Sequence, residues 1–156
     1  MITEIEQETS DITWFFTNGN EIGFVASGGG KLPNSISIKS IDEIELLAHY
    51  FEALPPITNV IVSPEVKNFI TPGTNRNEYI SYFSEMSKKG LFTFDKAVMN
   101  RFSDTNYHLV TQPTAPLNIH NLPTEILNLL TQTSLTGDIE KHLDVANFNE
   151  GHNQRY

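Results

Sequence analysis

The residues of this chain best suited to chemistry by type and spacing lie in one segment: Asp42, Glu45, His49 and Glu52. Glu45, His49 and Glu52 follow one another at helical spacing, so they share one face if the segment is helical. Carboxylates and an imidazole on one face could bind a metal ion, but di-metal helical proteins repeat a Glu-x-x-His motif on other helices. No such repeat occurs in this chain. We therefore interpret this face as a solvated acidic surface.

The acidic surface favours a basic protein as its partner. Residues 41 to 54 include four acidic side chains and no Lys or Arg. A surface of one sign steers and orients a partner of the opposite sign. We expect four residues to contact this partner: Asp42, Glu45, His49 and Glu52.

A glycine run at Gly28-Gly-Gly-Lys31 invites comparison with phosphate-binding loops, but its spacing is wrong. The phosphate-binding motif needs a Gly five residues before the Gly of its Gly-Lys pair, and position 25 is Val. The motif also needs Ser or Thr after the Lys, and position 32 is Leu. We predict a flexible or tightly turned surface loop that binds no nucleotide.

No linear catalytic motif is present. The chain has no cysteine, which excludes disulfides, thiolate catalysis and zinc–cysteine sites. There is no His-Glu-x-x-His and no Gly-x-Ser-x-Gly motif around the other histidines, which are His108, His120, His142 and His152. We infer that the chain is not an enzyme and uses neither a cofactor nor a metal. A catalytic site assembled from residues distant in the sequence stays open as an alternative.

The net charge of −9 narrows the range of partners. An excess of acidic residues repels phosphate backbones and anionic lipid surfaces, so we expect neither nucleic-acid nor membrane binding. The apolar runs are far shorter than the roughly 20 residues that span a bilayer. The acidic start of the chain also lacks the basic flank of a secretory signal. We expect a soluble, cytoplasmic protein.

Local patterns predict a single α+β domain over residues 1 to 156. Asn18-Gly19 between two β-rich runs predicts an antiparallel hairpin over residues 12 to 27. Ser40-x-x-Glu43 has the form of a capping box, so a helix should begin at about Ile41. The other expected elements are helices at residues 75 to 89 and 123 to 131, and strands at 57 to 62, 91 to 94 and 107 to 111.

These elements predict a mostly antiparallel sheet with an N-terminal hairpin and about three helices packed on it. Alternate strand residues face opposite ways, so we expect Trp14-Phe15-Phe16 to be buried on both sides of the sheet. The strand at 57 to 62 should also be buried. Residues 1 to 10 and 149 to 156 are expected to be frayed, and the tail from Ser134 fits either a helix or an extended segment.

Three stretches of the chain together resemble a known group of proteins. The first is Asp-Ile-Thr-Trp-Phe-Phe at 11 to 16 with Gly-Phe-Val-Ala-Ser-Gly-Gly-Gly-Lys-Leu-Pro at 23 to 33. The second is Lys-Lys-Gly-Leu-Phe-Thr-Phe-Asp at 88 to 95, and the third runs from Tyr107 to Pro123. They resemble small acidic bacterial proteins found as candidate immunity proteins of polymorphic-toxin and contact-dependent growth inhibition systems. The shared features are aromatic strands, glycine turns and proline stops rather than a catalytic signature.

The resemblance implies that the protein neutralises a toxin domain, often a basic nuclease, by stoichiometric occlusion. An acidic inhibitor gains association rate from steering and affinity from a desolvated interface centre. The implied partner is therefore a basic toxin domain. Two other classes stay open: a small enzyme with a spatially assembled site, and a structural or adaptor module that binds a neutral or acidic partner. The sequence does not determine the oligomeric state.

Overall fold

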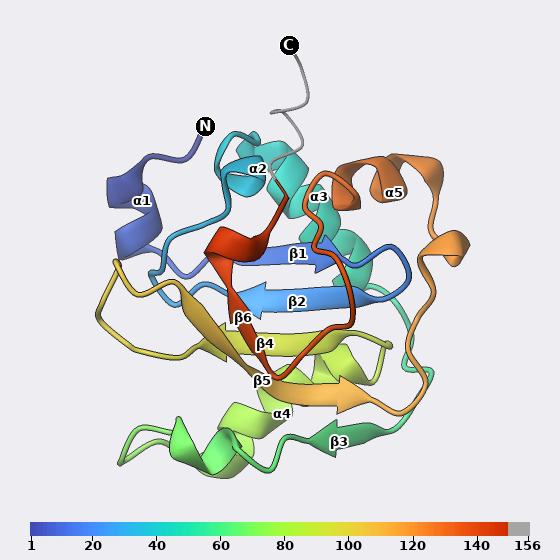
Figure 1. Ribbon diagram of the computed structural model, residues 1–156. Coiled ribbons are helices and arrows are strands. Elements are labelled where there is room, and N and C mark those ends of the chain that lie inside the picture. Colours follow the sequence, from blue (N-terminus) through green and yellow to red (C-terminus); the bar gives the residue numbers. More distant parts are fainter. Residues whose placement is uncertain (150–156) are drawn as a thin grey trace.

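The turn chemistry of Asn18-Gly19 sets the first two strands. In the computed structural model, which describes residues 1 to 149, β1 (Thr13–Thr17) pairs antiparallel with β2 (Ile22–Ala26) (Figure 1). Gly19 has a φ of 96°, in the left-handed region that favours glycine. The Asn18 side chain accepts a hydrogen bond from the backbone N–H of Glu21 at 2.8 Å, which closes the turn. The predicted hairpin is confirmed.

The sheet continues from β2 through β4 and β5. The remaining strands are β4 (Phe92–Lys96), β5 (Asn106–Pro113), β3 (Val60–Val62) and β6 (His142–Asp144). β2 and β4 pair in parallel, whereas the other strand pairs within residues 1 to 149 are antiparallel. Both β3 and β6 pair with β5, β3 near its end and β6 near its start. The predicted α+β class and mostly antiparallel sheet are confirmed.

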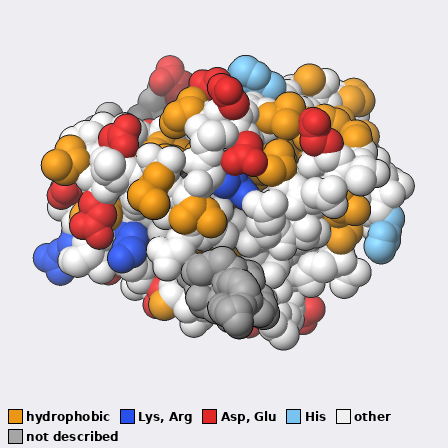
Figure 2. Space-filling view, turned by 90° about the horizontal axis from the view of Figure 1, so that it is seen from above, with side chains coloured by type: hydrophobic (Ala, Val, Ile, Leu, Met, Phe, Trp, Pro, Cys, Tyr) orange, Lys and Arg blue, Asp and Glu red, His pale blue; other side chains and the backbone are white. Residues whose placement is uncertain are grey.

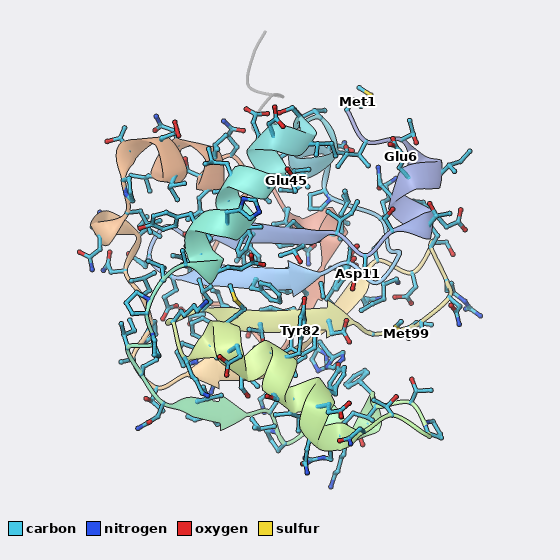
Figure 3. The ribbon with its side chains drawn as sticks, turned by 180° about the vertical axis from the view of Figure 1, so that it is seen from behind. Met1, Glu6, Asp11, Glu45, Tyr82 and Met99 are labelled. Atoms are coloured by element: carbon cyan, nitrogen blue, oxygen red, sulfur yellow. The ribbon has the colours of Figure 1, made fainter. Side chains whose placement is uncertain are left out.

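Two helices, α3 (Ile41–Glu52) and α4 (Arg76–Ser87), cover the back of the sheet (Figure 3). α5 (Thr124–Leu130) packs against α3 at the β1 edge of the sheet. α3 begins where the sequence predicts, because Ser40 Oγ accepts from the N–H of Glu43 at 3.1 Å and Glu43 caps in return. Leu47 and Phe51 on its inner face are buried in the core between the helices and the sheet. Burial of this apolar stripe fixes the rotation of α3.

The aromatic run of β1 is buried on both sides, as predicted. Phe15 packs in the core between the helices and the sheet, called here the back core, with its ring centroid 4.7 Å from that of Phe51. Trp14 and Phe16 point to the opposite face of the sheet, into a second cluster called the front core, where both rings contact Phe148. α2 (Asn34–Ser37) and the 3₁₀ turn Val145–Asn147 help to cover this front face. Two further 3₁₀ turns, Val66–Asn68 and Ile119–Asn121, lie in connections.

The expectation that residues 1 to 10 are frayed is wrong. They include α1 (Glu4–Thr9), which starts with a capping box between Thr3 and Glu6. Ile2 is buried, and the Gln7 side chain is anchored at both ends: its Nε2 donates to the Ile2 carbonyl and its Oε1 accepts from Leu32 N–H, each at 3.0 Å. The buried Gln7 thus holds α1 to a segment 25 residues away. The polar composition of residues 1 to 10 does not predict this contact.

The strand predicted at residues 57 to 62 is shorter and more exposed than expected. Strand pairing is limited to Val60–Val62, and Ile57 and Ile61 are exposed. β3 lies at the end of the strand order, so its outer side has no neighbouring strand within residues 1 to 149. An apolar run of this kind suits a buried strand and an edge strand equally well, and only the strand order decides between them.

The C-terminal tail adopts an extended path rather than a helix. After α5 the chain passes β1, with a parallel bridge between Thr17 and Ser134, and then forms β6. Asn149 N–H donates to the Ser134 carbonyl at 2.8 Å, so this residue is not frayed, and residues 150 to 156 of the predicted frayed end lie outside the described residues. Among residues 1 to 149, no helix is long and apolar enough to cross a membrane.

Candidate functional site

α3 presents the predicted partner-binding residues as one exposed stripe. Its members are Asp42, Glu45, His49 and Glu52, and all four are exposed. At 100° per residue they fall within an arc of about 80° on the helix. The buried Leu47 and Phe51 lie on the inner side of α3, and Glu45 is carried by the helix on the back of the molecule (Figure 3). The stripe is therefore a consequence of the same periodicity that builds the core.

The carboxylates of the stripe form no ion pair with another element of residues 1 to 149. The ion pairs within residues 1 to 149 involve Glu65, Glu85 and Asp104, and none includes an acidic residue of α3. Lys39, the cation that precedes α3, is only 3% exposed and donates to Gln132 Oε1. Burial lowers the pKa of Lys39, and the charge of Glu43 opposes this effect. Lys39 is therefore bonded to Gln132 rather than ion-paired with a carboxylate of the stripe.

The two ends of the stripe differ. Asp42 and Glu52 are about 15 Å apart along the helix. At the Glu52 end, Lys89 Nζ donates to the backbone carbonyl of Glu52, where the helix dipole favours a cation. This cation comes from the connection after α4 and could not be placed from the spacing within α3. The N-terminal half, with Asp42 and Glu45, is therefore the more strongly acidic part.

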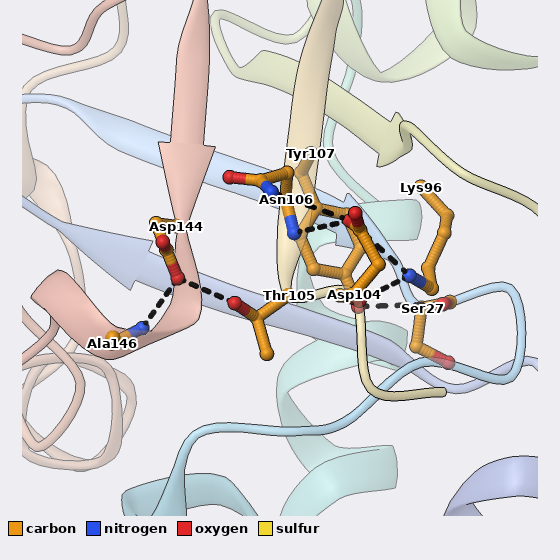
Figure 4. A network of polar contacts seen from close by, with 8 residues as sticks. All are labelled: Ser27, Lys96, Asp104, Thr105, Asn106, Tyr107, Asp144 and Ala146. Carbon is orange, nitrogen blue, oxygen red and sulfur yellow. Dashed lines mark hydrogen bonds and ion pairs between the residues drawn. The ribbon is translucent and has the colours of Figure 1, made fainter. Parts of the chain in front are cut away.

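The glycine loop is a packing element of the front core. Gly28 and Gly29 have φ values of 53° and 78°, and a Cβ on Gly30 would lie 2.6 Å from Lys96 Cδ and 2.7 Å from Tyr107 Oη. The buried Lys96 ammonium donates to the Asp104 carbonyl, and Tyr107 Oη donates to Ser27 at 3.3 Å (Figure 4). The glycines allow the loop to close over these side chains, which fits the predicted tight turn.

A polar cluster on the back face was missed by the sequence reasoning. The Tyr79 hydroxyl of α4 donates to Asp95 Oδ2 on β4 at 2.6 Å and lies 3.5 Å from His108 Nε2 on β5. Asp95 and His108 are direct partners across the two strands. The His108 ring stacks on Phe69 with centroids 3.9 Å apart, and its Nδ1 has no hydrogen-bond partner within residues 1 to 149. Strand pairing and helix docking bring these residues together, so no short sequence motif predicts the cluster.

Burial shifts the acidities of all three residues in this cluster. It raises the pKa of Asp95 to about 6, although the hydrogen bond from Tyr79 opposes the rise. It lowers the pKa of His108 to about 4, and the nearby His142 adds to this effect while Glu65 opposes it. It also raises the pKa of Tyr79, whose hydroxyl lies beside the Asp95 carboxylate. At neutral pH the cluster thus contains an ionised carboxylate and a neutral imidazole joined through the uncharged Tyr79 hydroxyl.

The main hollows of the surface lie elsewhere. Two of them, about 230 Å³ and about 680 Å³, share Glu140, His142 and Asn147 beside the C-terminal segment. Neither is lined by Tyr79, Asp95 or His108, so these two hollows do not open onto the cluster. Among residues 1 to 149, no three His, Asp or Glu side chains gather closely enough to hold a metal ion.

Within residues 1 to 149, His120 and His142 lie apart from each other and from His49. His142 Nε2 lies 3.0 Å from Glu65 Oε1 at the surface, and His120 is exposed on a 3₁₀ turn. His152 lies outside the described residues. Among the histidines within residues 1 to 149, only His49 belongs to the acidic stripe of α3.

Comparison with protein-family models, curated proteins and solved structures finds no match to this chain. The resemblance to immunity proteins therefore stays a prediction from the sequence.

Proposed function

We propose that this chain is a binding protein that neutralises a basic bacterial toxin domain by covering it in a stoichiometric complex. The observation that carries the proposal is the exposed stripe of α3, with Asp42, Glu45, His49 and Glu52. Its carboxylates have no ion-pair partner within residues 1 to 149. An acidic surface held on a rigid helix is suited to attract and orient a basic partner.

Steering explains how such a protein would act quickly enough to protect a cell. Complementary charge raises the association rate of two proteins well above that of neutral surfaces, and salt screens the effect. The net charge of −9 acts over the whole molecule, and the stripe of α3 directs the approach to one face. We place this event in the cytoplasm, where a bound toxin domain would be kept from its target.

The distribution of polar groups favours binding over catalysis. An active site usually combines an accessible hollow with groups of perturbed acidity. Here Asp95 and His108, two groups with shifted pKa values, lie beneath α4 and Phe69, whereas two main hollows lie beside the C-terminal segment and a third at the β1–β2 turn. The acidic residues of α3 are also gathered on one stripe rather than scattered, which favours a basic partner over a neutral one.

The direct test is complex formation with the product of the adjacent upstream gene. The full chain is co-expressed with the C-terminal domain of that product, and the mixture is analysed by size-exclusion chromatography with light scattering. We expect a complex of one copy of each chain and protection of the host cells from growth arrest. Separate elution of the two proteins together with unprotected growth would reject the proposed function.

The contribution of the stripe is measured by association kinetics at low and high salt. The variant Asp42→Lys/Glu45→Lys/Glu52→Lys should associate more slowly and with a flatter salt dependence, because rim charges act mainly on encounter. The matched control carries the same change in net charge on exposed acids of other elements: Glu78→Lys, Asp138→Lys and Glu140→Lys. Equal slowing in both variants would show that total charge, rather than the stripe, attracts the partner.

A further inference from the structure

Exposed apolar side chains accompany the acidic stripe. Ile41 is 57% exposed and Leu46 is 38% exposed, although both belong to α3. At 100° per residue, Ile41 and Leu46 lie on opposite sides of the stripe. Ile38, in the short connection from α2 to α3, is 53% exposed. Three large aliphatic residues thus lie in water around a group of carboxylates.

This combination is more than a solubility feature. Single exposed apolar residues are common on protein surfaces, but a group of them marks a contact surface. Figure 2 shows hydrophobic and acidic side chains intermingled on the face that is the top of Figure 1. Between Lys39, which is buried, and Lys67 the sequence has no Lys or Arg. Charge therefore selects a basic occupant, and the aliphatic side chains select one that also offers apolar area.

We propose that Ile38, Ile41, Asp42, Glu45 and Leu46 form one docking surface, the acid–apolar face, for a cationic surface that carries apolar area on either side of its basic groups. The inference rests on the proposed function for the choice of a basic protein partner. The carboxylates govern the encounter, and burial of the aliphatic side chains beside them slows dissociation. The acidic stripe is then only one part of the interface, and its apolar flanks provide most of the affinity.

A second exposed apolar group offers both the rival location and the matched control. Ile57 is 55% exposed and Ile61 is 46% exposed at the edge strand β3. Residues 53 to 63 contain no charged side chain, so this edge has no charge to select a basic partner. Docking at β3 is therefore the outcome that would overturn the proposal, and substitutions there are similar in chemistry and exposure to those at Ile38 and Ile41.

The first experiment needs no knowledge of the natural partner. Two synthetic helical peptides of about 18 residues, or five turns, are titrated into the ¹⁵N-labelled full chain. One has Lys on one face and Leu on the other, and in the second each Leu is replaced by Ser. We expect amide shifts over residues 36 to 49 and binding of the Leu peptide about tenfold tighter or more, since an aliphatic side chain that leaves water contributes this much.

Variants decide whether the shifts report the proposed surface. Ile38→Ser/Ile41→Ser should remove the preference for the Leu peptide, while Ile57→Ser/Ile61→Ser should keep it. Equal affinity for the two peptides, or shifts centred on residues 57 to 62, would overturn the inference. Thermal unfolding of both variants identifies any loss of binding that comes from loss of fold.

The second experiment separates this inference from the proposed function. With the toxin domain of the upstream gene as the probe, Ile38→Ser/Ile41→Ser should raise the dissociation rate at least about tenfold and leave the association rate nearly unchanged. An unchanged dissociation rate would overturn the acid–apolar face and leave the immunity function standing. If the toxin domain does not bind while the Leu peptide maps as expected, the immunity function fails and the docking surface stands.

Discussion

The buried pair of Asp95 and His108 makes a specific prediction about how stability depends on pH. The pKa of Asp95 rises from an ordinary 3.8 to about 6 in the folded protein, so folding favours its protonated form. Its contribution to stability is therefore complete below about pH 4 and is lost as the pH rises through about 6. A pKa difference of about 2 corresponds to about 3 kcal/mol.

His108 has the opposite dependence. Its pKa falls from 6.5 to about 4 on folding, so the folded protein favours the neutral ring. Its contribution is complete above about pH 6.5 and is lost as the pH falls towards 4, again by about 3 kcal/mol. Between about pH 4 and 6 the folded state holds one proton on Asp95, whereas the unfolded state holds one on His108. The effects of the two residues on the pH dependence of the free energy of unfolding therefore cancel. The pair adds almost no pH dependence to the stability of the native protein.

Replacing either residue alone should reveal the pH dependence of stability that the other one contributes. Asp95→Asn keeps an acceptor for Tyr79 but removes the titration, so its stability relative to the native protein should rise by about 3 kcal/mol between about pH 4 and 6 and then level off. His108→Phe keeps the stacking on Phe69 and removes the other titration. Its relative stability should fall by about 3 kcal/mol over nearly the same range.

Urea unfolding at several pH values measures these differences. Trp14 is the single tryptophan and is buried, so its fluorescence reports the loss of the core. The control is Glu125→Gln, which removes one exposed carboxylate on α5 and leaves the buried pair unchanged. Profiles of Asp95→Asn and His108→Phe that run parallel to the native one would refute the argument, because each substitution must unbalance the pair if burial governs both acidities.

Three further predictions follow from the core, the helix cap and the glycine loop. Leu47→Ala should cost about 2–5 kcal/mol of stability, because it leaves a cavity between α3 and the sheet; an unchanged urea midpoint would mean that the helix is rotated. Ser40→Ala should cost about 0.5–2 kcal/mol through loss of the cap, and Ser40→Thr should restore most of it. ATP or GTP should give no saturable heat in calorimetry, with Lys31→Ala as the comparison; saturable binding that Lys31→Ala abolishes would contradict the assignment of the loop to packing.

Local chemistry allowed the sequence to predict much of the fold. The Asn18-Gly19 turn, the capping box at Ser40 and the apolar stripe with Leu47 and Phe51 all act over a few residues, and the structure contains each of them. The exposure of Asp42, Glu45, His49 and Glu52 follows from the same helical period. Contacts between residues within one or two turns can be predicted from their spacing, because the backbone geometry that joins them is known in advance.

Only the tertiary structure decided which segments meet. It placed Lys89 at the carbonyl end of α3, turned β3 into an exposed edge and anchored residues 1 to 10 through Gln7. It also brought Tyr79, Asp95 and His108 together from a helix and two strands. Such contacts depend on strand order and helix docking, which arise from burial of apolar surface summed over the whole chain. Burial over the whole chain cannot be read from a short stretch of sequence. The acidic stripe of α3 could therefore be predicted, whereas the elements that surround it could not.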